Sequence, residues 1–284
     1  MSGFAHITAQ PLTGALGAEV SGVDLSGELN SDTVRDIRNA LLRYGVIFFR
    51  DQALTPNTQK RFGRYFGELN IDRFVKAPDG HPEIMPVIKE VDDKRGFAGM
   101  WHSDVTFLEE PALGSILYAR EIPSCGGDTL FSNMYLAYES LSPGMQALLR
   151  DLQAVHCAAV TYLRSRMDES NTSPKGMKYT DHDPNSETAV HPVVRTHPET
   201  GRQALYVNCA YTQRFEGMTE EESRPLLDYL YQHLGRPEFS CRFRWKKGSV
   251  AFWDNRCTQH LPVNDFSGER REMHRIAIRG DRPV

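Results

Sequence analysis

The amino-acid sequence predicts a single domain of mixed α/β class, with more strands toward the C-terminal half. Segments with the two-residue period of strands alternate with segments that have the longer period of helices. The 284 residues contain no Pro/Gly/Ser-rich linker and no internal repeat. Hydrophobic residues make up 40% of the chain and charged residues 25%, which are ordinary globular values and exclude a wholly disordered chain.

The N-terminal part predicts a strand followed by a helix. Apolar and polar residues alternate over Ala18–Leu25, as in a half-buried strand. Asn30 or Ser31 can cap the helix that follows, and Gly45 suits the left-handed position just after its end. The apolar face of this helix comprises Val34, Ile37, Leu41 and Tyr44.

Three further elements follow from short patterns. The apolar run Val46–Phe49 predicts a buried strand, and Thr55 followed by a proline opens a second helix. Thr219 and Glu222 form a capping-box pattern for a third helix, in which Pro225 predicts a kink or a later start.

Two late strands and one irregular segment complete the prediction. The strands are expected over 249–253 and 275–278. The segment 164–190 is polar with little periodicity. A loop of this length is expected to be a lid or flexible loop, or equally a disordered surface insertion.

Charge and cysteine content limit the partners and the compartment. The chain has 33 Lys and Arg against 37 Asp and Glu, a net charge of −4, so no overall electrostatic reason exists for binding nucleic acid or an anionic membrane. No signal peptide is visible, and the apolar runs are too short to span a bilayer. Five widely spaced cysteines without a CxxC pair predict reduced thiols in a cytoplasmic protein.

Among the ten histidines, two stand near residues that suggest a metal site. In an extended strand His102 and Asp104 would point to the same face, and His260 follows a probable strand 156 residues after Asp104. Two His and one carboxylate are the facial triad of non-haem Fe(II) oxygenases, whereas structural zinc prefers four N/S ligands. The alternative is an ordinary hydrogen-bonded His–Asp pair.

The remaining histidines are explained structurally. His191 and His197 each precede a proline and are predicted to lie in loops, while His156 and His274 lie beside apolar residues and are predicted to be core histidines.

Two arginines follow the second candidate metal ligand. Arg271 and Arg275 come 11 and 15 residues after His260. Arginine suits bidentate capture of a carboxylate or sulfonate. Either arginine alone would be explained as a surface charge, but the two together suggest a pair of anionic groups near one metal.

The combination resembles the taurine / 2,4-dichlorophenoxyacetate dioxygenase family of Fe(II)- and 2-oxoglutarate-dependent oxygenases over nearly the whole chain. The motifs that carry the resemblance are Pro11–Val20, Trp101–Phe107, Gly126–Thr129, Tyr206–Asn208, Trp253–His260 and Arg271–Arg275. The resemblance implies a mainly β core, a double-stranded β-helix (jelly roll, cupin-like) with flanking helices.

The resemblance also implies roles for individual residues. Iron would be held by His102, Asp104 and His260. Thr129 and Arg271 would bind the carboxylates of 2-oxoglutarate, with Trp253 near the metal. The implied residues for the primary substrate are Arg275, Tyr211 and Val105.

The implied reaction uses Fe(II), 2-oxoglutarate and O2. It hydroxylates a C–H bond of a small anionic substrate, a carboxylate, sulfonate or sulfate ester, and releases succinate and CO2. If the hydroxylated carbon bears a heteroatom, the bond to that heteroatom breaks. By family analogy, the chain would assemble as a dimer or tetramer.

Departures from the family's pattern bear on the substrate. Taurine dioxygenases carry a His in the segment that matches Leu69–Phe74, and an Asn shortly before the H-x-D motif; this chain has neither. The stretch Gln213–Thr219 looks closer to aryloxyalkanoate dioxygenases. The alternatives are a taurine dioxygenase proper, a cupin-like metal-dependent enzyme that does not use 2-oxoglutarate, and a binding protein on the same scaffold.

Overall fold

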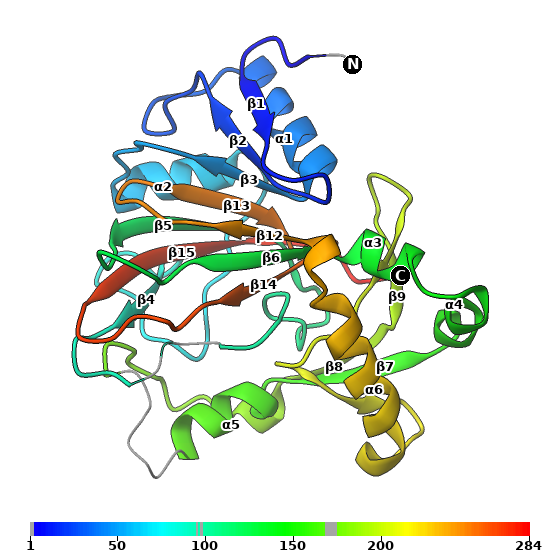
Figure 1. Cartoon of the computed structure of the whole chain (residues 1–284). Coiled ribbons are helices and arrows are strands. Elements are labelled where there is room, and N and C mark those ends of the chain that lie inside the picture. Colours follow the sequence, from blue (N-terminus) through cyan, green and yellow to red (C-terminus); the bar gives the residue numbers. More distant parts are fainter. Residues whose placement is uncertain (1–2, 95, 97–98, 168–174) are drawn as a thin grey trace.

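A large β-sheet forms the centre of the molecule (Figure 1). The computed structural model describes residues 3–94, 96, 99–167 and 175–284. Across the large sheet the strands lie in the order β1 (Thr8–Pro11), β2 (Ala18–Ser21), β3 (Val46–Phe49), β13 (Val250–Asp254), β5 (Ala112–Glu121), β15 (Arg271–Arg279) and β4 (Met85–Lys89). Neighbours are antiparallel except β2 and β3, which are parallel.

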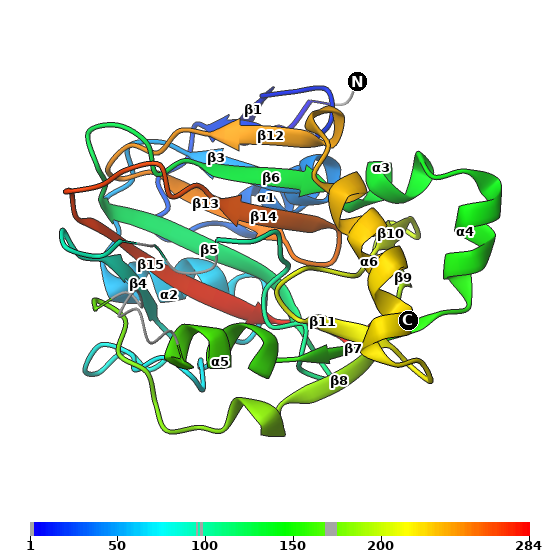
Figure 2. The ribbon, with the colours of Figure 1, turned by 60° about the horizontal axis from the view of Figure 1, so that its bottom comes forward.

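A smaller sheet packs face to face against the large one (Figure 2). Its strands lie in the order β12 (Ser240–Phe243), β6 (Thr129–Asn133) and β14 (Thr258–Pro262). Phe131 and Phe243 of this sheet pack with Phe48 and Trp253 of the large sheet in one buried cluster. The space between the two sheets is therefore a hydrophobic core.

Two helices cover the opposite face of the large sheet. Helix α1 (Ser31–Tyr44) and helix α2 (Pro56–Arg64) bury Ile37 and Phe62 against Phe49 and Phe252. Because the side chains of a strand alternate between faces, Phe48 points to the inter-sheet core and Phe49 to the helices. Burial on both faces explains why β3 is a continuous apolar run rather than an alternating one.

A second group of elements packs beside one end of the two sheets (Figure 1). It contains the sheet β11 (Thr212–Phe215), β7 (Gln153–Cys157) and β8 (Thr188–Pro192), and the pair β10 (Gln203–Leu205) and β9 (Val194–Thr196). The helices are α3 (Met134–Glu139), α4 (Pro143–Arg150), α5 (Ala159–Met167) and α6 (Glu220–Leu234), with short 3₁₀ turns at Pro184–Ser186 and Pro237–Phe239.

The local predictions for helix ends are confirmed. Asn30 caps α1 by accepting the N–H of Thr33 at 2.8 Å, and Gly45 follows with φ +70°. Thr219 and Glu222 form the capping box of α6. The alternative of a later start for α6 is wrong, because the helix begins at Glu220 and Pro225 lies inside it.

Other predictions need correction. Strand β2 ends at Ser21 rather than continuing to Leu25. The segment 164–190 is not irregular throughout: residues 164–167 belong to α5, and the segment's end contains a 3₁₀ turn and the start of β8. Residues 168–174 lie outside the described part, so the lid stays a prediction.

Two buried features agree with the sequence. The five cysteines are free thiols, with Cys157, Cys241 and Cys257 buried. His156 is a core histidine, whereas His191 is buried but belongs to strand β8 rather than to a loop. Within the described residues, no helix has the length and apolar character needed to cross a bilayer.

Candidate active site

The structure brings His102, Asp104 and His260 together at the edge of the small sheet. His260 lies on β14, and His102 pairs with it through backbone hydrogen bonds of 3.1 and 2.8 Å. The two imidazole rings lie 4.0 Å apart, and His102 Nε2 is 3.8 Å from Asp104 Oδ1. One ligand atom from each of the three residues lies within 4.8 Å of the others.

The prediction that His102 and Asp104 share an extended strand is wrong. His102 makes a single bridge, and the chain turns at Asp104. The turn is marked by Val105, which has φ +50°, a conformation that is strained for a β-branched residue. The Asp104 N–H is held by Asn255 Oδ1 at 3.0 Å rather than by a neighbouring strand.

The protonation of the three residues suits a metal ion. His102 Nδ1 lies 2.8 Å from the carbonyl of Met100, so Nδ1 carries the proton and Nε2 has a free lone pair. Burial lowers the pKa of both histidines. Burial would raise the pKa of Asp104, but Arg275 and the two histidines outweigh it and hold this pKa at about 2. At neutral pH the site therefore offers two neutral imidazoles and one carboxylate, as Fe(II) requires.

A narrow pocket of about 60 Å³ lies beside these ligands, between the sheets. The predicted site residues in its wall are His102, Thr129, Trp253, His260, Arg271 and Arg275. Arg271 and Arg275 share a face because residues i, i+2 and i+4 of a strand point the same way, and Met273 between them enters the inter-sheet core.

Arg271 lines this pocket with hydrogen-bond donors that a ligand could satisfy. Its side chain is buried, and its Nε and Nη2 atoms have no hydrogen-bond partner among the described residues. Burial lowers the pKa of Arg271 to about 10, so the guanidinium is still charged at neutral pH. A buried cation with unpaired donors is unfavourable until an anion reaches it. This orphan guanidinium fits a carboxylate such as that of 2-oxoglutarate.

Thr129 and Trp253 are held by neighbours in the same wall. Trp245 Nε1 donates to Thr129 Oγ1 at 3.0 Å, which leaves the threonine proton available to a ligand. Trp253 donates its Nε1–H to Asn255 at 2.9 Å and packs 4.7 Å from the ring of His260. The sequence around Trp245 contains no signal for this contact with Thr129. The contact depends on the pairing of β12 with β6, which lie more than 100 residues apart in the chain.

A wider pocket of about 850 Å³ adjoins the narrow one, and Arg275 lines both. Val105 lies in the wall of the wider pocket, as predicted. Tyr211 is not part of the lining of either pocket; its ring packs 5.1 Å from Phe107, which does line the wider one.

Arg275 lies beside two carboxylates. It pairs with Asp104 Oδ1, and its Nη2 lies 3.5 Å from Asp72 Oδ2. Asp72 lies in the connecting segment between α2 and β4, and no local pattern in the sequence indicates that it faces Arg275. An anionic substrate at Arg275 therefore meets a guanidinium that already has an acidic neighbour.

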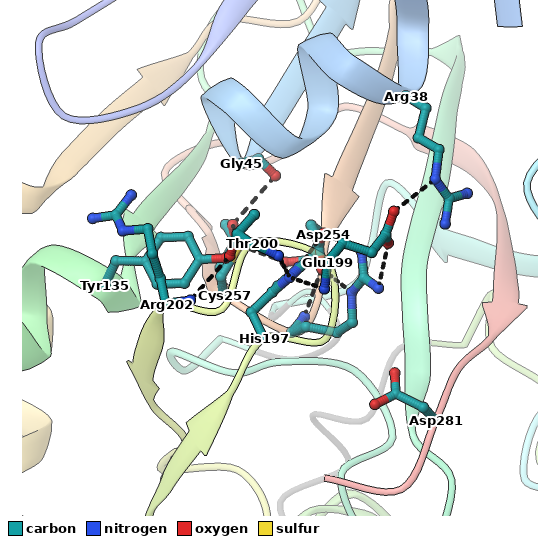
Figure 3. Close-up of polar contacts among 12 residues, drawn as sticks. Arg38, Gly45, Tyr135, His197, Glu199, Thr200, Arg202, Asp254, Cys257 and Asp281 are labelled. Carbon is teal, nitrogen blue, oxygen red and sulfur yellow. Dashed lines mark hydrogen bonds and ion pairs between the residues drawn. The ribbon is translucent and has the colours of Figure 1, made fainter. Parts of the chain in front are cut away.

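A second buried cluster includes the turn between β13 and β14 and the loop that carries His197 (Figure 3). His197 accepts the N–H groups of Glu199 and Thr200 at Nδ1, both at 3.2 Å, so its Nε2–H donates to Asp254 at 3.0 Å. Arg256 donates to both oxygens of Asp254, at 2.8 and 2.7 Å, and to Glu199 at 2.7 Å. His197 lies in a loop just after β9, as predicted, and its ring is buried in this network.

This cluster is an ion-pair network rather than a metal centre. The ligand atoms of His197, Asp254 and Cys257 lie within 4.8 Å of one another. However, the guanidinium of Arg256 forms an ion pair with both oxygens of the Asp254 carboxylate. Burial also raises the pKa of the Cys257 thiol to about 12, so this sulfur stays protonated at neutral pH. A cation at this position would have to displace the arginine.

The network makes a prediction about stability and pH. Burial would raise the pKa of Asp254, but Arg256 and His197 outweigh it and hold the pKa well below the usual value of 3.8. A carboxyl whose pKa is lower in the folded state stabilises the fold above its unfolded pKa, and this contribution is lost as the pH falls. We expect Asp254→Asn to lower the free energy of unfolding by about 3–5 kcal/mol at pH 7.

Urea unfolding at pH 7 and below pH 3.8 measures the effect, and the difference between the wild type and the variant should shrink at the lower pH. Asp32→Asn is the matched control, because Asp32 forms an exposed ion pair with Arg35 that contributes less than about 1 kcal/mol. Equal losses for the two variants would contradict the assignment.

The fold and the site define a class of protein. Two neutral histidines and a carboxylate lie next to a buried guanidinium that has no partner among the described residues, in a region between two β-sheets. This set of groups fits a non-haem iron oxygenase with an anionic cosubstrate.

Comparisons with known proteins identify the family. The family described as "Taurine catabolism dioxygenase TauD, TfdA family" matches residues 8–277. The chain is 38% identical over 278 residues to an alkylsulfatase of Acinetobacter baylyi, covering 97% of this chain and 86% of the relative. It is 35% identical over 283 residues to an alpha-ketoglutarate-dependent sulfate ester dioxygenase of Pseudomonas putida, covering 98% and 91%.

A solved structure of similar fold gives the same family. The crystal structure of a taurine dioxygenase from Burkholderia xenovorans has a TM-score of 0.82 and 39% identity, covering 98% of this chain and 91% of that one. The chain belongs to the TauD, TfdA family. It is an Fe(II)- and 2-oxoglutarate-dependent dioxygenase that uses O2.

Proposed function

We propose that this enzyme hydroxylates a C–H bond of a small anionic organic substrate, with sulfate esters and sulfonates as the first candidates. The observation that carries the proposal is the pair of guanidinium groups. Nε and Nη2 of Arg271 have no partner among the described residues in the narrow pocket, and Arg275 lines both this pocket and the wider one. One site for a cosubstrate carboxylate and one for a substrate anion follow from this arrangement. The names of the relatives support sulfate esters in particular.

In this proposal His102, Asp104 and His260 hold Fe(II), and Thr129 and Arg271 bind 2-oxoglutarate beside Trp253. When bound, iron with 2-oxoglutarate and O2 supplies the oxidising power and releases succinate and CO2. The chain orients the reactants and excludes water. Arg275 and Val105 hold the substrate, and Tyr211 supports the wall through Phe107.

Hydroxylation of the carbon next to a sulfate-ester oxygen would complete the reaction without further catalysis. The product carries a hydroxyl and a sulfate on one carbon. Loss of the hydroxyl proton and breakage of the carbon–oxygen bond then give an aldehyde and free sulfate.

We further infer that both sheets form one double-stranded β-helix domain spanning 1–284, with a lid within 164–190. The face-to-face packing of the two sheets supports the fold. The free thiols support a reducing cytoplasm. Assembly into a dimer or tetramer stays a prediction that light scattering of the purified protein tests.

A succinate-release screen tests the proposed reaction. The protein is incubated with Fe(II), ascorbate and 2-oxoglutarate, and with alkyl sulfates, alkanesulfonates, taurine or aryloxyacetates. We expect an alkyl sulfate or sulfonate to stimulate succinate release, with aldehyde formed in equal amount. Equal stimulation by the corresponding uncharged alcohols would contradict an anionic substrate, and stimulation by taurine alone would support the alternative of a taurine dioxygenase.

Arg275→Ala should raise the KM for the primary substrate by about 10- to 100-fold, because a charge-assisted hydrogen bond contributes about 1.5–3 kcal/mol. The KM for 2-oxoglutarate should change much less. Steady-state kinetics with each substrate varied in turn measure both values, and Mn(II) binding is measured in parallel because Arg275 also pairs with Asp104. The opposite pattern would show that Arg271 and Arg275 have exchanged roles.

A further inference from the structure

A closed ring of hydrogen bonds surrounds the carboxylate of Asp104. Asn255 Oδ1 accepts the Asp104 N–H at 3.0 Å and the Trp253 Nε1–H at 2.9 Å. Asn255 Nδ2 donates to Ser115 Oγ at 3.1 Å, and Ser115 Oγ donates to Asp104 Oδ2 at 2.6 Å. Asp104 and Ser115 are completely buried and Asn255 is 1% exposed, so water does not compete with these bonds.

The direction of every bond in this ring is fixed by chemistry. A backbone N–H and an indole N–H can only donate, so the group of Asn255 that faces them must be its oxygen. Its NH2 group therefore faces Ser115 and donates to it. The single hydroxyl proton of Ser115 is then left for Asp104 Oδ2, which accepts it.

The consequence is that the two oxygens of Asp104 have different partners. Oδ2 is occupied by Ser115, whereas Oδ1 is the oxygen that faces His102 Nε2 at 3.8 Å and also accepts from Arg275. Without the ring, a carboxylate can rotate and exchange its oxygens. The ring therefore selects the oxygen that faces the metal ligands.

The ring also fixes the backbone of the turn that carries Asp104. Val105, the next residue, has φ +50°, and such a conformation persists only where surrounding contacts over-determine it. Asn255 itself lies between Asp254 and Arg256, whose buried ion pairs hold the turn between β13 and β14 (Figure 3). The turn between β13 and β14 thus holds the strained turn at Asp104 and Val105 through the hydrogen bond of Asn255.

We propose that Asn255 and Ser115 are positioning residues that orient the Asp104 carboxylate toward the metal and thereby set the metal affinity of the apoenzyme. The inference rests on Asp104 as a metal ligand, which is part of the proposed function. Residues that orient a metal ligand typically change metal affinity about 10- to 100-fold when they are replaced.

The test measures binding of Mn(II) alone, without 2-oxoglutarate or substrate, by electron paramagnetic resonance of the free ion. Ser115→Ala should weaken Mn(II) binding by about 10- to 100-fold. Ser132→Ala is the matched control: Ser132 is completely buried on β6 and donates to the carbonyl of Leu234 at 2.6 Å, so it loses the same group without touching the ring. The control should bind Mn(II) like the wild type.

Asn255→Ala is the second variant, and it keeps the proposal testable if Ser115→Ala does not fold. Because both residues act through one carboxylate, the double variant should lose much less affinity than the product of the two single losses. Wild-type Mn(II) affinity in a folded Ser115→Ala or Asn255→Ala protein would overturn the proposal, and so would equal losses in Ser115→Ala and Ser132→Ala. The failure of every substrate in the succinate screen would leave these Mn(II) results intact, so the two proposals can fail separately.

Discussion

Asp104→Ala should abolish substrate-coupled succinate release. Asp104 is the one carboxylate in the buried group with His102 and His260, and its low pKa keeps it ionised at every working pH. Its loss leaves two neutral ligands, while Arg275 loses its closest partner. Metal-ion catalysis contributes several kcal/mol, so turnover should fall by at least about 1,000-fold.

Succinate and Mn(II) binding are measured together for this variant. Asp36→Ala is the matched control, because Asp36 is a buried carboxylate that accepts the N–H groups of Ala5 and His6 away from the site. The control should lose stability and keep its kcat. Full coupled turnover in Asp104→Ala would show that the metal assignment is wrong.

Arg271→Met should raise the KM for 2-oxoglutarate by at least about 100-fold, since two charge-assisted hydrogen bonds at about 1.5–3 kcal/mol each would be lost. The neighbouring Arg270 is the control. It lies just before β15 and pairs with Glu90, Glu121 and Glu272, so Arg270→Met should leave this KM unchanged. Equal effects of the two variants would contradict the proposed cosubstrate site.

The same variant should be no less stable than the wild type without ligand. Burial lowers the pKa of Arg271 from 12.5 to about 10, so the folded state disfavours the cation and its charge reduces stability below pH 10. Methionine removes that unfavourable charge at pH 7.

Thermal unfolding in the presence of Mn(II) tests the cosubstrate site directly. N-oxalylglycine, a stable mimic of 2-oxoglutarate, should raise the Tm of the wild type but not that of Arg271→Met.

Local signals predicted the elements that depend on local chemistry. Three such predictions are confirmed: the helix cap at Asn30, the capping box at Thr219 and the buried strand over Val46–Phe49. The residues that determine each of them lie within a few positions of one another. The extended strand at His102 was wrong because the N–H of Asp104 is bonded by Asn255, which lies 151 residues away. No local pattern records a partner so distant.

The same distinction applies to the site. The three candidate metal ligands and the two arginines could be proposed from residue type and family motif, and the structure gathers His102, Asp104 and His260 into one group. Ser115, Trp245 and Asp72 could not be found in this way. Each acts through a partner that only the strand pairing or the folding of a loop brings within reach.

The two pockets differ in the kind of backbone structure that supplies their walls. The narrow pocket takes His260, Thr129, Trp253 and Arg271 from paired strands, where hydrogen bonds to neighbouring strands restrict movement. Much of the wider pocket comes from the connecting segments 68–74 and 105–110. Connecting segments accept sequence change more readily than paired strands do. Sequence change in the segments 68–74 and 105–110 can therefore alter the shape of the wider pocket and its substrate preference while the strands that line the narrow pocket stay as they are.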